Sequence, residues 1–144
     1  MTEGPAPGRD GVVMAAIDSL RIKIFADGAD LDGIAKLYKN PLIKGFTTNP
    51  TLMNKAGVRD YEAFARAVLK VVPDRPVSFE VFADEFGEME AQARVIAAWG
   101  GNVNVKIPIT NTKGASAAPL IGRLSAAGVV VNVTAIMTPA QVQT

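Results

Sequence analysis

Five short segments of the chain are rich in apolar and β-branched residues and have the length of β-strands. They cover residues 22–28, 45–50, 77–82, 103–110 and 129–136. Between them, apolar residues recur at helical spacing over residues 30–38, 60–72, 84–99 and 115–127, and a further helix opens at Thr138. The pattern predicts five successive βα units of about 25–30 residues each.

Polar residues at the starts of the expected helices support this division. The residues placed as caps are Asp30, Asn49 before Pro50, Asp60, Asp84, and Thr138 with a capping-box Gln141. Helical spacing also predicts which residues are buried. The stripe of the first helix comprises Leu31, Ile34, Ala35, Leu37 and Tyr38, and Tyr61 falls in the stripe of the helix over 60–72.

The alternation of strands and helices indicates an α/β protein with a parallel sheet. An open doubly wound sheet and a (β/α)₈ TIM-type barrel both have this order of elements. No Gly-x-Gly-x-x-Gly follows the first strand, which disfavours a dinucleotide site.

Lys106 lies in the middle of the strand over 103–110, between apolar neighbours. Successive strand residues point to opposite faces, so Val103, Val105, Ile107 and Ile109 share one face, and Asn104 and Lys106 share the other. Two interpretations are open. Lys106 lies on the solvated face of an antiparallel sheet, or its amine lies inside a barrel, where desolvation lowers its pKa and lets it attack a carbonyl.

The other strands favour the barrel, because in each of them polar residues fall on one parity and mostly apolar residues on the other. An open sheet covered by helices would be apolar on both faces, whereas a barrel collects polar groups at its C-terminal face. The residues expected to converge there are Asp27, Asn49, Glu80, Lys106, Asn132 and Thr134, with Thr47 on the same side as Asn49.

Composition restricts the chemistry of such a site. The chain has no histidine and no cysteine, which removes the commonest zinc ligand, the usual general base and thiolate catalysis. One amine, two carboxylates, two amides and a hydroxyl form no metal-ligand cluster. They suit Schiff-base chemistry: a neutral lysine attacks a ketone, one carboxylate takes a hydroxyl proton during C–C cleavage, and the other carboxylate holds the shuttling water. This class I aldolase scheme needs no cofactor.

Size and charge set the remaining expectations. The 144 residues are 49% hydrophobic, enough for one domain with a core, and Lys+Arg of 15 against Asp+Glu of 14 leaves no basic stripe for nucleic acid. No apolar run of about 18 residues is present to span a membrane. We expect a cytoplasmic protein with a flexible N-terminal tail and lead-in over residues 1–20 and a single domain over residues 21–144.

Four motifs make the chain resemble the transaldolase family from about Ile22 to Gln141. They are Phe-Ala-Asp-Gly-Ala at 25–29, Thr-Thr-Asn-Pro-Thr at 47–51, Val-Ser-Phe-Glu-Val at 77–81 and Val-Lys-Ile-Pro-Ile-Thr at 105–110; Val-Asn-Val-Thr at 131–134 adds a fifth. The resemblance implies transfer of a dihydroxyacetone unit between sugar phosphates in carbohydrate metabolism, of the pentose phosphate type, without a cofactor.

The same resemblance implies roles for single residues. Lys106 matches the Schiff-base lysine, Asp27 the acid–base for the sugar hydroxyl, and Glu80 the residue that holds the catalytic water. Thr134 is grouped with these catalytic residues, while Asn49, Asn132 and Thr47 are expected to bind substrate. The related fructose-6-phosphate aldolases, which are C–C lyases, carry glutamine at the position of Glu80, so this glutamate favours transaldolase.

Structural roles are alternatives for several of these residues. In these alternatives Asn49 serves as a helix cap, alone or together with a ligand role. Asp27 would be an aspartate of a turn, and Thr47 would only fill its strand. Glu80 and Thr134 would form a simple buried hydrogen-bonded pair.

The chain departs from the resemblance in length, since a complete barrel takes about 250 residues and eight strands. We expect the chain to be the N-terminal part of a longer barrel. If it acts alone, the alternatives are assembly with another chain, as in a homo-oligomer, or a truncated inactive fragment that persists as a folding or interaction remnant.

Overall fold

The computed structural model describes residues 21–143, so the tail predicted over residues 1–20 lies outside the described residues. The predicted alternation of strands and helices is confirmed within that range. The elements are β1 (Ile24–Asp27), α2 (Leu31–Tyr38), β2 (Ile43–Thr47), α3 (Pro50–Lys55), α4 (Tyr61–Val71), β3 (Val77–Glu80), α5 (Phe86–Ala97), β4 (Val103–Pro108), α6 (Ala118–Ala126), β5 (Val131–Thr134) and α7 (Pro139–Val142).

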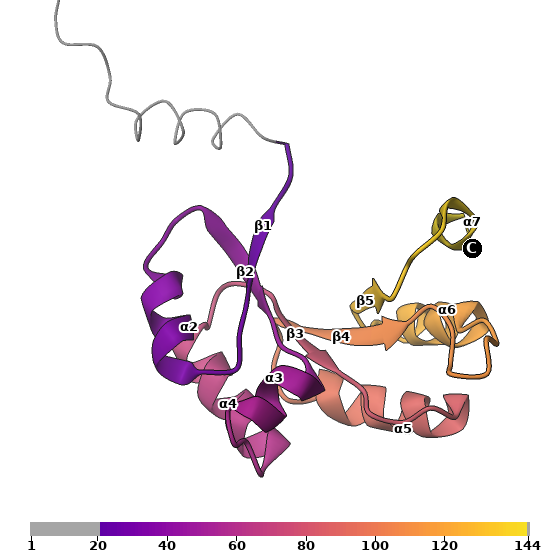
Figure 1. The fold of residues 1–144 in the computed structure, drawn as a ribbon, viewed down its shortest axis with the longest axis horizontal. Helices are drawn as coiled ribbons and strands as arrows, with labels where there is room; N and C mark the ends of the chain where they lie inside the picture. Colours follow the sequence, from indigo (N-terminus) through magenta and orange to yellow (C-terminus); the bar gives the residue numbers. More distant parts are fainter. Residues whose placement is uncertain (1–20, 144) are drawn as a thin grey trace, which may run out of the picture.

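The five strands form one parallel sheet in the order β1-β2-β3-β4-β5 (Figure 1). Each strand therefore pairs with the next one in sequence, and the order nowhere reverses as it does at the switch point of a doubly wound sheet. The sheet curls, and α2, α4, α5 and α6 lie along its outer side (Figure 1). The described residues form part of a (β/α) barrel of the TIM type, as the sequence predicted.

The hydrophobic core lies between the outer face of the sheet and these helices. Val105 and Ile107 of β4 are fully buried, as is Phe79 of β3. Met89 of α5 and Leu124 of α6 belong to the same cluster. The parity prediction for residues 103–110 is confirmed, because the alternate apolar residues are buried and the polar ones face the concave side.

Most of the predicted helix caps are confirmed. The side chains of Asp30, Asn49 and Asp60 each accept the backbone N–H three residues further on, and Thr138 and Gln141 form a capping box. Gly128 ends the turn after α6 with a φ of 82°, a left-handed conformation that glycine adopts without a steric cost.

Two sequence predictions about the helices are wrong. Asp84 does not cap α5, which has Glu85 at its N-cap with no side-chain hydrogen bond; the Asp84 carboxylate binds Thr112 instead. In α2 only Ile34 is fully buried, and Leu31 and Leu37 are 37% and 38% exposed. Helical spacing identified the apolar stripe, but α4 covers only its centre.

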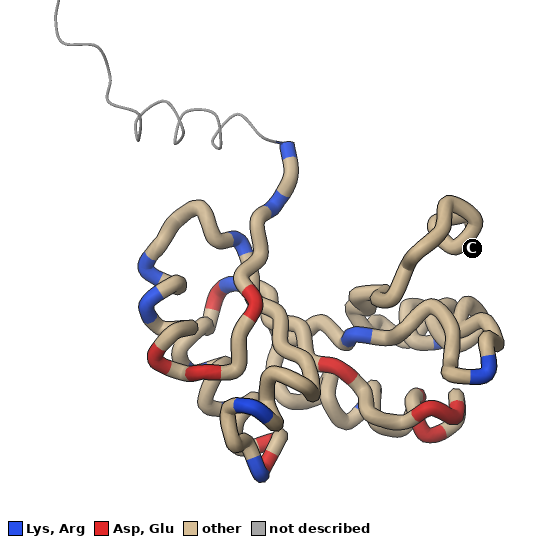
Figure 2. The backbone as a smooth tube through the Cα atoms, viewed as in Figure 1, with Lys and Arg blue, Asp and Glu red and all other residues tan. Residues whose placement is uncertain are grey.

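Acidic and basic positions are interspersed along the backbone (Figure 2). Several of them form exposed pairs on the helices, such as Arg66 with Glu62 and Arg94 with Glu90 at i,i+4 spacing. No helix within residues 21–143 combines the length and apolar character needed to cross a membrane.

The core assignment predicts a contrast between two leucine truncations. Leu124→Ala removes a side chain with no exposed surface and should lower the free energy of unfolding by about 3 kcal/mol. Leu37→Ala makes the same chemical change at an exposed position and should lower it by less than about 1 kcal/mol. Urea unfolding followed by circular dichroism measures both values, and equal losses would contradict the assignment.

Candidate active site

The register of the parallel strands places polar residues in rows across the concave face. Lys106 of β4 pairs with Glu80 of β3 on one side and with Asn132 of β5 on the other. Asp27 of β1 pairs with Thr47 of β2 in a second row, which continues to Ser78 of β3. Asp27, Thr47 and Glu80 are the last residues of their strands, so these side chains lie at the carboxyl ends, where barrel enzymes build their sites.

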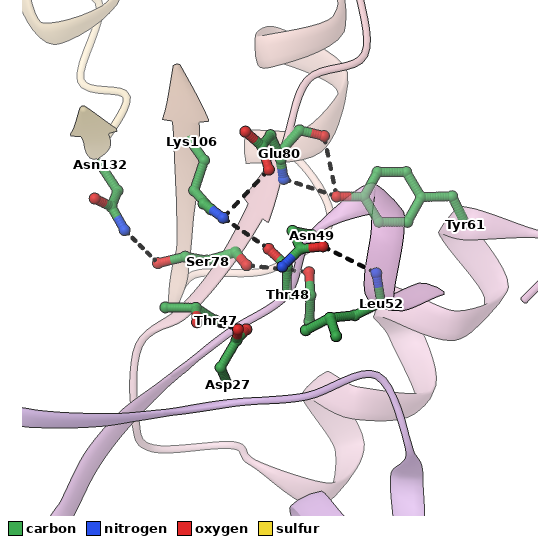
Figure 3. Close-up of polar contacts among 10 residues, drawn as sticks. All are labelled: Asp27, Thr47, Thr48, Asn49, Leu52, Tyr61, Ser78, Glu80, Lys106 and Asn132. Carbon is green, nitrogen blue, oxygen red and sulfur yellow. Dashed lines mark hydrogen bonds and ion pairs between the residues drawn. The ribbon is translucent and has the colours of Figure 1, made fainter. Parts of the chain in front are cut away.

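Lys106 is held from two directions on this face (Figure 3). Its Nζ donates to the backbone carbonyl of Thr48 at 2.9 Å and to Oε2 of Glu80 at 3.2 Å. The lysine side chain is 13% exposed and the Glu80 side chain 22% exposed. The amine therefore lies within the sheet's concave face beside a carboxylate, and the interpretation of a solvated lysine on an antiparallel sheet does not fit this structure.

Glu80 is fixed through its backbone as well as its carboxylate. Its N–H donates to the hydroxyl of Tyr61 at 2.8 Å, and the same hydroxyl donates to the Glu80 carbonyl at 3.1 Å (Figure 3). Burial raises the pKa of the Tyr61 hydroxyl well above its usual value, so this group stays protonated and keeps its proton as a donor.

The two asparagines have different surroundings. Asn132 donates through Nδ2 to the hydroxyl of Ser78 at 3.2 Å, which turns its amide along the concave face (Figure 3). The Oδ1 of Asn49 accepts the N–H of Leu52 at 2.9 Å and so caps α3. The cap uses only the amide oxygen, and within residues 21–143 the Asn49 Nδ2 makes no hydrogen bond. A cap and a ligand role are therefore geometrically compatible.

Asp27 lies apart from the lysine–glutamate pair. Its Oδ1 accepts the hydroxyl proton of Thr47 at 2.9 Å, and its residue is exposed on the concave side of β1 (Figure 3). This contact gives Thr47 a definite partner, so the residue does more than fill the strand. Asp27 and Lys106 belong to neighbouring rows of the same face, and no hydrogen bond or ion pair joins them.

Thr134 is half-buried at the end of β5, where it pairs with Pro108. Its side chain makes no hydrogen bond to any residue in the described part of the chain. Glu80 and Thr134 therefore do not form a hydrogen-bonded pair, since the Glu80 carboxylate contacts Lys106 instead.

Three contributors to the site were absent from the sequence prediction. They are the Thr48 backbone carbonyl, the fully buried Ser78 hydroxyl and the Tyr61 hydroxyl. A backbone acceptor carries no sequence signal. Helical spacing puts Tyr61 in the apolar stripe of its helix, and only the rule that a buried tyrosine hydroxyl needs a partner indicates a polar role for it.

A hollow of about 540 Å³ opens beside the glutamate, lined by Asn49, Pro50, Thr51, Leu52, Glu80, Val81 and Phe82. It adjoins the end of β3 and the start of α3, and it gives a ligand access to the Glu80 side of the pair. Across residues 21–143 no group of three or more His, Cys, Asp or Glu side chains is arranged to hold a metal ion.

The loop after β3 is tied to the loop after β4 at the rim of this face. Asp84 accepts the hydroxyl proton of Thr112 at 2.6 Å and the Thr112 backbone N–H at 2.8 Å. Hydrogen bonds from the Thr112 hydroxyl and backbone hold the pKa of the Asp84 carboxyl below its usual value.

Thr112→Val removes the hydroxyl donor and should raise the pKa of Asp84 toward its ordinary value. Because the folded-state pKa is lowered, this contact stabilises the fold above the unfolded-state pKa, and that stabilisation is lost as pH falls through the folded-state pKa. Carboxyl ¹³C NMR titration measures the change, with the exposed Thr51→Val as control. An unchanged Asp84 titration in Thr112→Val would contradict the contact.

Comparison with known proteins agrees with the geometry. The family model described as Transaldolase/Fructose-6-phosphate aldolase matches residues 24–144. A "Probable transaldolase" of Dehalococcoides mccartyi is 41% identical over 113 residues, which is 78% of this chain and 50% of that protein. A "Probable transaldolase" of Streptococcus agalactiae is 41% identical over 120 residues, 83% of this chain and 53% of that protein.

A "Probable transaldolase 2" of Listeria monocytogenes is 39% identical over 120 residues, 83% of this chain and 52% of that protein. The chain thus spans about half the length of the curated relatives it matches. The matched range includes all five strands and every residue of the lysine–glutamate site. The chain belongs to the transaldolase/fructose-6-phosphate aldolase family.

Proposed function

We propose that this chain carries the Schiff-base half of a transaldolase site, which transfers a dihydroxyacetone unit from a ketose phosphate to an aldose phosphate. The observation that carries the proposal is the Lys106 amine on the concave face, 3.2 Å from the Glu80 carboxylate and 13% exposed. Family membership and the names of the relatives support the same chemistry.

The first step joins the amine to the ketone. The Lys106 ammonium transfers a proton to the Glu80 carboxylate. The lone pair of the resulting neutral amine then attacks the ketose carbonyl to form a carbinolamine. Glu80 returns the proton to the carbinolamine hydroxyl, which leaves as water, and a protonated imine remains. The close contact supports this role, since a general base must lie within hydrogen-bond reach of the proton it takes or reach it through one water.

The second step breaks a carbon–carbon bond. Asp27 removes the proton of the hydroxyl on the carbon β to the imine, the α–β bond breaks, and its electron pair moves into the protonated imine to give an enamine. The aldose leaves, a second aldose accepts the enamine carbon, and water releases the new ketose from Lys106. Asn49 and Asn132 orient the sugar hydroxyls, and Thr47 holds the Asp27 carboxylate through the 2.9 Å contact.

Chemical trapping tests the nucleophile. The folded chain is incubated with a ketose phosphate, reduced with borohydride and mapped by peptide mass spectrometry. The adduct should form on Lys106 and vanish in Lys106→Met. The control Lys44→Met removes an exposed lysine of β2 and should leave the adduct unchanged. A folded chain without an adduct on Lys106 would instead support the inactive-remnant alternative.

The two carboxylates should separate imine formation from bond cleavage. Asp27→Asn keeps an oxygen for the Thr47 hydroxyl but cannot take a proton, so trapping on Lys106 should persist while aldose release falls about 100-fold or more. Glu80→Gln should slow the trapping itself. The reaction is followed by coupled detection of the released aldose, and Asp27→Asn with wild-type release would contradict the assignment.

The acceptor distinguishes transaldolase from the aldolase alternative. A transaldolase releases its product ketose only when an aldose acceptor is present, whereas a C–C lyase releases free dihydroxyacetone without one. Turnover of a ketose phosphate by the unreduced chain, measured with and without an aldose phosphate, therefore decides between the two.

A further inference from the structure

The backbone pairing of β2 with β3 ends at Ser78, two residues before Glu80. Phe46 donates its N–H to the Pro76 carbonyl at 2.9 Å, and Thr48 donates to the Ser78 carbonyl at 3.1 Å. In a parallel ladder the same pattern of backbone hydrogen bonds repeats every two residues along each strand. The next bonds would run from the Glu80 N–H to the Thr48 carbonyl and from the N–H of residue 50 to the Glu80 carbonyl.

Neither of those two bonds exists. Residue 50 is proline and has no N–H to donate. The Thr48 carbonyl accepts the Lys106 amine at 2.9 Å instead of the Glu80 N–H. Glu80 would therefore carry an unpaired donor and an unpaired acceptor at the end of β3, which is costly for half-buried backbone groups.

The Tyr61 hydroxyl supplies both missing partners. It accepts the Glu80 N–H at 2.8 Å and donates to the Glu80 carbonyl at 3.1 Å, so one side-chain oxygen replaces two ladder bonds. The ring is fixed in a cluster of edge-to-face contacts, with centroids 4.9 Å from Phe82, 5.1 Å from Trp99 and 6.0 Å from Phe79. Asp60 caps the same helix next to it and sets its first turn.

We propose that Tyr61 is a positioning residue of the site. By pairing with the Glu80 backbone in place of β2, it leaves the Thr48 carbonyl free to hold the Lys106 amine, and it fixes the glutamate beside that amine. The proposal rests on the proposed function only in regarding Lys106 as the nucleophile. The pairing itself belongs to the fold.

Tyr61→Phe tests this with a matched control. The change removes the hydroxyl and keeps the ring, and Tyr38→Phe removes the chain's other tyrosine hydroxyl, which donates to Asp74 at an exposed site. Two readouts are measured in folded protein: hydrogen exchange of the Glu80 amide by NMR, and the rate at which trace acetic anhydride acetylates Lys106 relative to Lys44, by mass spectrometry.

In Tyr61→Phe the Glu80 amide should exchange about tenfold faster or more, since its acceptor is gone. Lys106 acetylation should change about threefold or more, because the Glu80 N–H then competes for the Thr48 carbonyl that holds the amine. Tyr38→Phe should change neither. A purely structural role for Tyr61 would lower the melting temperature and leave relative Lys106 acetylation unaltered, and that result would overturn the proposal.

If Tyr61→Phe does not fold, amide hydrogen exchange in the wild-type chain tests the proposal. The Glu80 amide should be protected to the same degree as the Thr48 amide, which makes a ladder bond. Exchange of the Glu80 amide at the rate of an unstructured peptide would overturn the proposal. These readouts require no sugar and no turnover, so a failed trapping experiment would reject the proposed function and leave this inference standing.

Discussion

The structure depends on the register between β3 and β4, which sets Glu80 beside Lys106 on the concave face. A shift of one residue would turn every side chain of β4 to the opposite face, burying the lysine among Met89 and Leu124 and exposing Val105 and Ile107. The apolar residues of β4 therefore determine where the amine lies. Their burial between the sheet and the helices keeps the Lys106 amine 3.2 Å from the Glu80 carboxylate, and both groups lie on strands.

The fold followed from the sequence because its signals were local and repeated. Each strand shows an alternation of polar and apolar residues, and the caps at Asp30, Asn49 and Asp60 mark helix starts that formed as expected. Asp84 shows where this reasoning fails. An aspartate before a helix can serve any nearby donor, and Thr112, 28 residues away in sequence, lies close enough only after folding.

The site was predictable to the extent that strand parity determines it. Parity placed Lys106, Glu80 and Asn132 on one face, and the register then made them neighbours. It could not show that the Thr48 carbonyl would hold the amine or that a helical tyrosine would complete the strand ladder. Those contacts arise where the pairing of β2 with β3 ends, and they join residues that are far apart in the sequence.

A crystal structure of the chain, reduced with borohydride in the presence of dihydroxyacetone, would show whether Lys106 is the nucleophile of the site. We expect continuous density from Lys106 Nζ into the three-carbon unit on the concave face, with the Glu80 carboxylate within hydrogen-bond reach of the new C–N bond. Density showing Lys106 unmodified and extended into solvent, with Glu80 turned away from it, would contradict this role of Lys106.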